Sequence, residues 1–392
     1  MNPIILTQEQ EQAVSSILDF ILDTDPANNR YVLTGIAGSG KTTILKEVVN
    51  QYQLITKIEK GIDDKFIPFT FIFTAMTNIA SSVLSSVVGN SRTLHNYLKL
   101  FPNMYALSVK PNPYDFIIID ESSMLDDTLL ATISPLTNKI LFIGDSTQLP
   151  PVGLNHSPVF YQDYPTTELT HSIRQSSNTS VGIYCSQLQD YIRGNSDFPK
   201  LTCTNDIIHL SATDFENQII NNFQSNSKVL SLSNKTSMRY AKLINNSLTN
   251  TDIAIGDKVY VNSYHSDLSK QELYTIQALK ESTSLGTKGY TVTLGLNNNK
   301  ETFFTPFNSA KYKNKERSVS FKPEDRAIFK KCWVDIRHNY SSTIHKAQGS
   351  TYEDVYLDLN DFKYLKAQKE LARLLYVAFS RATNKIYLTG DI

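Results

Sequence analysis

Residues 31–43 read YVLTGIAGSGKTT, in which an apolar segment runs directly into a glycine-rich loop and then into a helical pattern. The loop matches G-x-x-x-x-G-K-[ST], the pattern of a phosphate-binding loop, whose backbone N–H groups surround anionic oxygens. The following helix presents the positive end of its dipole to the same charge. The alternative is a glycine-rich turn without a ligand, which the flanking strand and helix patterns disfavour. The stretch therefore predicts a nucleoside triphosphate site formed by Gly35, Ala37, Gly38, Ser39, Gly40, Lys41, Thr42 and Thr43.

A pair of acidic residues supplies the chemistry that such a loop requires. Lys41 is expected to reach the β- and γ-phosphates of ATP, and the Thr42 hydroxyl to hold Mg²⁺. Asp120 and Glu121 end a second apolar run, DFIIIDE, at 115–121. Such a Walker B arrangement predicts that Asp120 holds Mg²⁺, directly or through water, and that Glu121 polarises the attacking water. A solvated acidic turn is the alternative interpretation. ATP and Mg²⁺ are the predicted cofactors.

Composition limits the class of protein. The 392 residues are 41% apolar, and 38 Lys and Arg balance 38 Asp and Glu, so nucleic acid would have to bind in a local groove. The three cysteines lie far apart and the seven histidines lack metal-ligand spacing, which indicates neither a disulfide framework nor a zinc site. No signal-peptide pattern opens the sequence, and no apolar run approaches the ~20 residues that span a bilayer. We expect a soluble, cytoplasmic protein without a membrane partner.

The order of predicted elements indicates two α/β cores. Near-continuous apolar runs at 31–34, 69–74, 115–119 and 139–143 are typical of parallel strands buried on both faces, and 77–88 fits a helix between two of them. The pattern returns as strands at 228–232, 340–344, 353–359 and 385–389, with helices at 235–247 and 366–379. Between them, segments such as DKVYVNSY and GYTVTLGL alternate apolar and polar residues, as antiparallel strands with one solvated face do. The predicted domains are a first core at 1–98 and 114–165, a short insertion at 99–113, a second core at 166–251 and 335–392, and a β-rich insertion at 252–334.

Three further motifs narrow the class of nucleotide-binding protein. In GDSTQLPPV, at 144–152, the Gln148 amide is placed to touch the γ-phosphate, although a proline-stiffened loop would explain the string in isolation. LTHSIRQ contributes Arg174, and LYVAFSRA contributes Arg381 at the end of a helix. The string SSTIHKAQGST, at 341–351, joins a strand to a helix in the second core. Each arginine alone is most simply a surface residue, and only the whole set is specific.

These motifs follow one another in the order found in a known family. From Gln10 to Arg381 the chain resembles superfamily-1 DNA helicases of the RecD-like branch, and most closely the phage Dda helicase. The most specific strings are HKAQGST followed by LYVAFSRA, and DESS followed by GDSTQLPPV. The resemblance implies two RecA-like P-loop cores with parallel sheets and ATP bound between them. It also implies a short wedge insertion in the first core and a β-barrel, SH3-like insertion in the second.

The resemblance also assigns residues. It places Gln10 at the adenine, Arg174 and Arg381 at the γ-phosphate as arginine fingers in cis, and Gly349 near the nucleotide. It implies a single-stranded DNA path whose hydroxyl and amide groups bind phosphates without a large net charge. A helix cap is an adequate alternative role for the threonines that follow the second strand. The implied DNA contacts are Thr74, Thr77, Asn78, His95, Asn234, Thr343 and His345.

Two departures from the family pattern concern DNA rather than ATP. Met76 stands where a proline is usual. The stretch that matches the duplex-splitting wedge, 99–113, is short, and its apolar residues are equally well explained as a hydrophobic plug under a loop. The wedge candidates are Phe101, Met104, Tyr105 and Leu107.

The resulting hypothesis is an ATP-dependent DNA helicase that translocates on single-stranded DNA, 5′-to-3′ by resemblance. Its partners would be single-stranded and fork DNA, with a single-strand-binding protein or a replisome component, and it would act as a monomer in replication or recombination. A phage origin would place it in the host cytoplasm. Three alternatives stay open: a DNA-stimulated translocase or protein-displacing motor without unwinding, a nucleotide-switched DNA-binding module, and an RNA helicase.

Overall fold

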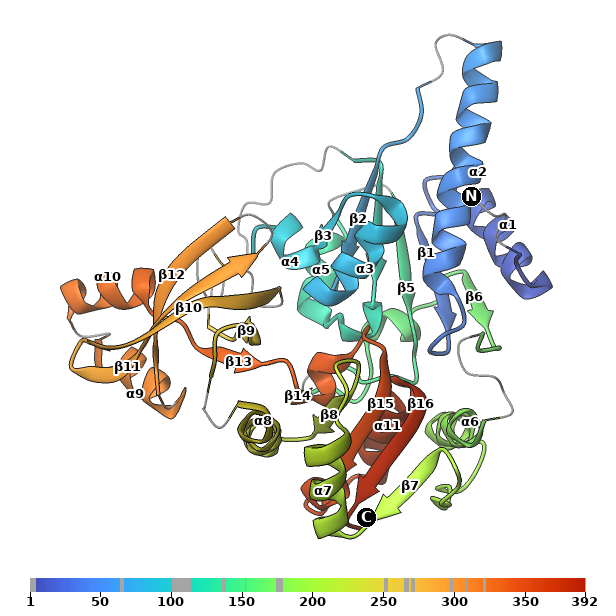
Figure 1. The fold of residues 1–392 in the computed structure, drawn as a ribbon. Coiled ribbons are helices and arrows are strands. Elements are labelled where there is room, and N and C mark those ends of the chain that lie inside the picture. The colour runs from blue at the N-terminus through green and yellow to red at the C-terminus, as the bar shows by residue number, and fades with distance from the viewer. Residues whose placement is uncertain are drawn as a thin grey trace. The chain divides into compact units, whose positions relative to one another are not determined.

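A computed structural model describes most of the chain (Figure 1). It divides into unit 1, which comprises Met1–Ile207, Gln348–Thr351 and Leu365–Lys385, and unit 2, which comprises Ile208–Ala347, Tyr352–Tyr364 and Ile386–Ile392. Each unit is described by itself. The described residues are all those of the chain except 1–4, 64–66, 101–113, 136–138, 152, 174–178, 250–252, 264–267, 269–271, 297–298, 308, 320–321 and 392, and except the side chains of 246–249 and 309–310.

Unit 1 is built on a six-stranded sheet in the order β3-β2-β4-β5-β1-β6. Every strand pair in it is parallel, as the apolar runs predict. Residues along the four central strands alternate between two hydrophobic clusters, since successive side chains point to opposite faces. Leu141 and Ile143 join one cluster, whereas Ile140 and Phe142 join the other. The strands are β1 (Arg30–Gly35), β2 (Phe71–Ala75), β3 (Ser91–Thr93), β4 (Phe116–Asp120), β5 (Lys139–Gly144) and β6 (Thr166–Leu169).

Helices cover both faces of this sheet. Residues of α1 and α2 supply one hydrophobic cluster, and residues of α4 and α5 supply the other. A capping box between Thr7 and Gln10 begins α1, which fixes Gln10 on the first helical turn. The helices of unit 1 are α1 (Gln8–Leu22), α2 (Lys41–Ile62), α3 (Asn78–Val88), α4 (Leu94–Tyr97), α5 (Asp127–Ile133), α6 (Ser180–Arg193) and α11 (Gln368–Phe379), with short 3₁₀ turns η1 (Ser122–Met124) and η2 (Pro158–Tyr161).

Unit 2 holds most of a second sheet, in the order β14-β8-β15-β16-β7. Both neighbours of β8 pair with it in parallel, so the second core predicted from the sequence is an α/β structure as well. Its elements are β7 (Ile207–Leu210), α7 (Ala212–Asn222), β8 (Lys228–Ser231), α8 (Asn234–Thr249), β14 (Ser341–Thr343), η3 (Ile344–Ala347), β15 (Tyr352–Asp358), η4 (Leu359–Phe362) and β16 (Ala382–Thr389).

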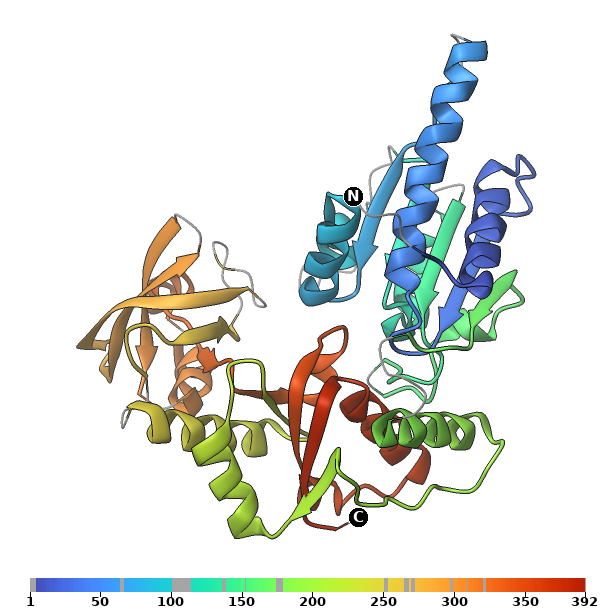
Figure 2. The same cartoon turned by 45° about the vertical axis from the view of Figure 1, so that its right-hand side comes forward.

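A five-stranded antiparallel sheet, ordered β12-β11-β10-β9-β13, interrupts this second core (Figure 2). Positive φ angles at Leu285 (47°) and Gly286 (73°) form the tight turn between β10 and β11. The sheet matches the predicted β-rich insertion, but the sequence pattern did not predict the two helices that follow its fourth strand. The elements are β9 (Lys258–Val261), β10 (Leu273–Ser284), β11 (Thr287–Leu296), β12 (Asn299–Pro306), α9 (Ser309–Val319), α10 (Pro323–Cys332) and β13 (Ile336–His338).

Candidate nucleotide site and nucleic-acid contacts

The glycine-rich loop of unit 1 connects β1 to α2 in a conformation that only glycine adopts easily. Gly38 and Gly40 have φ angles of 78° and 87°, in the left-handed region, and Gly40 is the N-cap of α2. A side chain at Gly35 would lie 2.8 Å from Leu169 Cβ, and one at Gly40 would collide with the Gln10 amide. The loop is therefore shaped by its glycines as a phosphate-binding loop requires.

Lys41 lies inside this loop, among the acidic residues of the neighbouring strand ends. Its Nζ donates to the carbonyl oxygens of Gly35 (2.7 Å) and Ile36 (2.9 Å). Burial lowers the pKa of Lys41, while the carboxylates of Asp145, Glu121 and Asp120 act in the opposite direction. An ammonium group carries three protons, so one beyond these two bonds can meet a phosphate oxygen.

The predicted acidic pair lies at the end of β4. Glu121 has a φ of 56°, rare for a residue with a side chain, and its N–H donates to Asp120 Oδ1 at 2.8 Å. Burial raises the pKa of Asp120 to about 7, and the adjacent Glu121 carboxylate acts in the same direction. The backbone strain at Glu121 is of a kind that gathers at functional sites, and it turns the chain out of strand geometry between the two carboxylates.

The donor set around this pair fits Mg²⁺. Asp120 and Thr42 offer a carboxylate and a hydroxyl, which are oxygen ligands that Mg²⁺ accepts beside waters and substrate phosphates. Among the described residues, no group of three or more His, Cys, Asp or Glu could hold a metal ion alone. Mg²⁺ at Asp120 and Thr42 stays a prediction.

Gln10 lies against the phosphate loop. Its Nε2 donates to the Ser39 carbonyl oxygen at 3.0 Å, and its Oε1 accepts the Thr7 N–H at 3.0 Å. Since an amide has two N–H donors and two lone pairs, one of each is left for a base. The role of Gln10 in adenine recognition stays a prediction.

The loop after β5 is organised by Asp145, which is 2% exposed. Its Oδ1 accepts the N–H (2.9 Å) and the hydroxyl (2.5 Å) of Thr147, and its Oδ2 accepts Nε2 of Gln148 at 3.3 Å. Arg373, from α11, donates to the carbonyl oxygens of Ser146 and Gln148. The loop that carries Gln148 is thus held from within and from α11.

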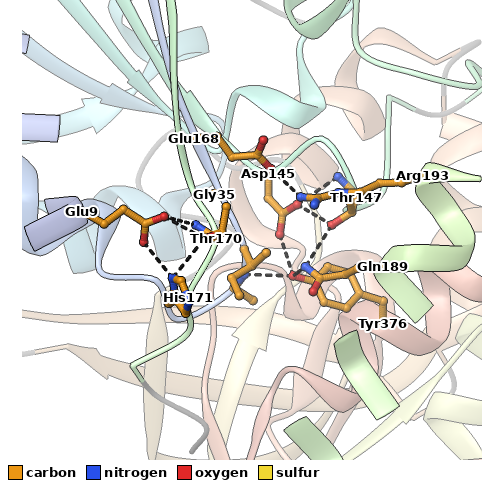
Figure 3. Close-up of polar contacts among 12 residues, drawn as sticks. Glu9, Gly35, Asp145, Thr147, Glu168, Thr170, His171, Gln189, Arg193 and Tyr376 are labelled. Atoms are coloured by element: carbon orange, nitrogen blue, oxygen red, sulfur yellow. Dashed lines mark hydrogen bonds and ion pairs between the residues drawn. The ribbon is translucent and has the colours of Figure 1, made fainter. Parts of the chain in front are cut away.

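A single hydroxyl group joins this loop to the phosphate loop (Figure 3). The Tyr376 hydroxyl donates to Asp145 Oδ2 at 2.7 Å, and it accepts the Ala37 N–H at 2.9 Å and Nε2 of Gln189 at 2.8 Å. Burial raises the pKa of Tyr376 well above its usual value, and the Asp145 carboxylate adds to the effect, so the hydroxyl keeps its proton. We call these four residues the Tyr376 junction. Tyr376 was not singled out from the string LYVAFSRA, although a tyrosine on a buried helix face usually finds a hydrogen-bond partner.

Several motif residues hold buried polar atoms that lack a hydrogen-bond partner among the described residues. They include Ser39 Oγ, Gln148 Oε1 and Gln348 Nε2. A buried polar group without a partner costs about 1–3 kcal/mol. These three atoms come from three separate motifs of unit 1, and both donors and acceptors are among them. They suit a site completed by a polar ligand.

Of the two arginines predicted as fingers, the structure describes only Arg381. Arg381 is 2% exposed and donates to the Val377 carbonyl (3.1 Å), the Ser380 hydroxyl (2.8 Å) and the Ser350 carbonyl (3.2 Å). Its charge lowers the pKa of Lys41, so the two cations lie within electrostatic range. Arg174 lies outside the described residues.

Two further segments lie near the predicted site, one beside the phosphate loop and one beside Glu121. Ile173 N–H donates to the Gly38 carbonyl at 2.9 Å, and the Ser172 hydroxyl donates to the Ala37 carbonyl at 3.1 Å, which ties the chain before Arg174 to the phosphate loop. Gly349 has a φ of 78°, and a side chain there would lie 3.5 Å from Glu121 Oε1. The residues predicted to bind or hydrolyse the nucleotide thus lie in unit 1, apart from Arg174, which is outside the described residues.

The predicted DNA contacts of unit 1 divide into buried and accessible residues. Thr74 is 0% exposed, and its hydroxyl donates to the Ile118 carbonyl of the neighbouring strand at 2.9 Å. Because this side chain is buried within the sheet, we do not retain Thr74 as a DNA contact. Thr77 caps α3, since its hydroxyl accepts the Ala80 N–H at 3.1 Å. Asn78 follows at the helix start, and His95 is exposed on α4.

The predicted DNA contacts of unit 2 lie at the ends of its strands. Asn234 is exposed at the start of α8, directly after β8, and His345 is half-buried in η3, directly after β14. Thr343 is 7% exposed at the end of β14. The wedge candidates Phe101, Met104, Tyr105 and Leu107 all lie outside the described residues.

Fold and site together define a P-loop nucleotide-binding protein with one all-parallel sheet and a second α/β sheet that is parallel on both sides of β8. The family model of an AAA domain matches residues 5–192, and that of a UvrD-like helicase C-terminal domain matches residues 338–389. Among curated proteins, the ATP-dependent RecD2 DNA helicase of Deinococcus radiodurans is 30% identical over 167 residues, which are 41% of this chain and 22% of that protein. The uncharacterized protein R530 of Acanthamoeba polyphaga mimivirus is 22% identical over 96% of this chain and 98% of its own length.

Solved structures of helicases share the fold. A Bacteroides Pif1 helicase in complex with ADP-AlF3 and ssDNA matches with a TM-score of 0.55 and 17% identity, over 100% of this chain and 94% of that one. A structure of two Pif1 helicases at forked dsDNA matches with a TM-score of 0.54 and 18% identity, over 100% and 93%. The predicted fold class and the predicted resemblance to superfamily-1 helicases of the RecD-like branch are confirmed. Particular likeness to Dda stays a prediction. Among the described residues, no helix is long and apolar enough to span a membrane.

Proposed function

We propose that this protein is an ATP-dependent DNA helicase that translocates along single-stranded DNA. The observation that carries the proposal is the gathering of the predicted hydrolytic residues within unit 1. Lys41 lies within electrostatic range of the predicted residues Asp120, Glu121 and Arg381. The matched models of an AAA domain and of a UvrD-like helicase C-terminal domain, together with the RecD2 relative, support the assignment of this set to a motor.

In the proposed reaction, ATP enters the phosphate loop, and the Lys41 proton that is not bonded to the Gly35 and Ile36 carbonyls meets a phosphate oxygen. Glu121 orients and polarises the attacking water, and Arg381, with Arg174, stabilises the charge that develops on the γ-phosphate. Mg²⁺, held by Thr42 and Asp120, would neutralise charge on the β- and γ-phosphates.

The Tyr376 junction is proposed to couple the nucleotide site to helix α11. Its hydroxyl contacts the phosphate loop at Ala37 and the Gln148 loop at Asp145, and Arg381 follows the helix that carries Tyr376. We propose that a shift of Gln148 on loss of the γ-phosphate is passed to α11 through this group. The two predicted cores, at 1–98 with 114–165 and at 166–251 with 335–392, would then alternate their grip on DNA.

The proposal extends to direction and context. We propose 5′-to-3′ movement on forked DNA, by a monomer that works with a single-strand-binding protein or a replisome component in replication or recombination. The proposal also keeps the cytoplasm, or the host cytoplasm for a phage protein, as the place of action.

Unwinding of a labelled duplex with a 5′ tail, compared with the same duplex carrying a 3′ tail, tests the helicase proposal. The proposal predicts ATP-dependent strand separation from the 5′-tailed substrate. Glu121→Gln, which keeps the size of the side chain but not its charge, should abolish it. Preference for the 3′ tail would refute the direction. ATP hydrolysis stimulated by DNA without strand separation from either substrate would favour the non-unwinding translocase.

A further inference from the structure

We propose that the helices α9 and α10 of unit 2, which we call the α9–α10 pair, form a binding surface for the phosphate backbone of DNA. The inference rests on the proposed function, because it assigns a further DNA contact to the proposed helicase. It concerns a part of the chain in which the sequence motifs predict no contact with nucleic acid.

Charge is distributed unevenly in a chain that is neutral overall. Residues 311–331 contain eight of the 38 basic residues and three of the 38 acidic ones, a net charge of +5, so the rest of the chain carries −5. Helix α10 has Glu324 and Asp325 in its first turn and two lysines in its last, which suits the helix dipole. Lys311 and Lys315 of α9, and Arg326 in the middle of α10, have no such explanation.

Basic side chains stand next to one another on each helix. Lys311 and Lys315 are four residues apart on α9, and Arg326 and Lys330 are four residues apart on α10. Residues so spaced are neighbours on a helix surface, and a like-charged pair there destabilises the helix. None of the four lies within ion-pair distance of a carboxylate among the residues that the structure describes. The like charges of each pair therefore repel each other, and a bound polyanion would relieve that repulsion.

The pair is a fixed platform. One side of each helix is buried in an aromatic cluster, in which the Phe329 and Trp333 rings are 5.1 Å apart and the Tyr312 and Phe329 rings 4.9 Å apart. The Trp333 Nε1–H donates to the Ser284 hydroxyl at 2.9 Å, which ties the end of α10 to β10. The basic side chains lie beside these anchors in the sequence, so the core of the insertion holds the backbone that carries them.

The chemistry of the surface points to phosphates rather than bases. Lys311, Arg326 and Lys330 are exposed and Lys315 is half-exposed. Neighbours four residues apart on a helix are separated by about 6 Å along its axis, close to twice the ~3.4 Å between phosphates of one DNA strand along the duplex. Lysine and arginine contacts to phosphates are independent of sequence, as a translocating motor requires.

The test compares two variants with the same change of charge. The first replaces Lys311, Lys315, Arg326 and Lys330 with glutamine, which keeps helix propensity. The control replaces the exposed Lys57, Lys200, Lys363 and Lys366 with glutamine. Equilibrium binding of the full chain to a labelled forked DNA is measured as a function of salt concentration, with ATP hydrolysis in the absence of DNA measured beside it.

If the α9–α10 pair binds DNA, the first variant binds about tenfold or more weakly than the wild type near 0.1 M salt. The slope of log K against log salt becomes shallower by up to ~0.9 for each phosphate that the variant no longer neutralises. The control keeps the slope of the wild type, and both variants keep DNA-independent ATP hydrolysis. A slope and affinity equal to those of the control would overturn the inference. Absence of DNA binding by the wild-type protein would instead refute the proposed function itself.

Discussion

Replacing Tyr376 with phenylalanine should lower the free energy of unfolding of unit 1 by far more than the loss of a hydroxyl group with a single hydrogen bond would. The ring stays in place, but the hydroxyl that serves Ala37, Asp145 and Gln189 is removed. Asp145 keeps its bonds to Thr147, whereas the Ala37 N–H has its partner taken away and Gln189 keeps only a 3.4 Å hydrogen bond to the Thr147 hydroxyl. With ~1–3 kcal/mol for each buried group left unsatisfied, the expected loss is about 3 kcal/mol.

Tyr184→Phe is the matched control for this prediction. Tyr184 is 3% exposed on α6, and its hydroxyl has no hydrogen-bond partner among the described residues. Removing that hydroxyl should leave stability unchanged or raise it, since a buried polar group without a partner is unfavourable.

Calorimetric unfolding of the two variants and the wild type measures the difference. A loss of about 3 kcal/mol from a unit of this size lowers its melting temperature by roughly 6–12 °C. Tyr376→Phe should also lower the kcat of ATP hydrolysis, because the phosphate loop and the Asp145 loop no longer share an anchor. A melting temperature and kcat for Tyr376→Phe equal to those of Tyr184→Phe would refute the junction.

Three further substitutions test other residues of the two units. Lys41→Ala should abolish ATP hydrolysis while circular dichroism shows an intact fold, and full activity would mean that the nucleotide binds elsewhere. Arg381→Gln should lower kcat by ~10³-fold or more with a much smaller change in ATP affinity, whereas an unchanged rate would remove Arg381 from the reaction. Burial lowers the pKa of Lys228 to about 7, although its Nζ donates to two oxygens of Asn339, so burial makes the folded state disfavour the charged form. The wild type should therefore gain stability as pH rises from about 7 toward 10, relative to Lys228→Met, by at most ~1.4 kcal/mol per pH unit; parallel denaturation curves at every pH would contradict this.

The sequence predicted the parts of the fold that local pattern determines. A strand buried on both faces must be apolar along its whole length, which is why β4 and β5 could be located from the letters alone. The phosphate loop could also be predicted, because its glycines are required locally. Gly38 and Gly40 have positive φ angles, and Gly35 and Gly40 leave no space for a side chain.

Contacts between distant segments left no such pattern. Tyr376 meets Ala37, Asp145 and Gln189 only after four segments fold together, and nothing local to LYVAFSRA shows it. Thr74 was predicted to contact DNA from the family resemblance, but its hydroxyl donates to Ile118 of the neighbouring strand.

The helices α9 and α10 were missed for a related reason. Their sequences are strongly polar, and each contributes only one or two residues to the buried aromatic cluster. A hydrophobic stripe that narrow does not display the helical period clearly. The cluster that anchors them also includes Phe304, which belongs to the preceding strand, β12.

ATP hydrolysis measured with and without a single-stranded DNA oligonucleotide, beside the same assay with single-stranded RNA, decides whether this protein is a DNA motor. We predict strong stimulation by DNA, because the hydrolytic residues of unit 1 are proposed to be coupled to a DNA path. Hydrolysis that is indifferent to DNA would contradict this prediction and favour a nucleotide-switched module, and stimulation by RNA alone would make the protein an RNA motor.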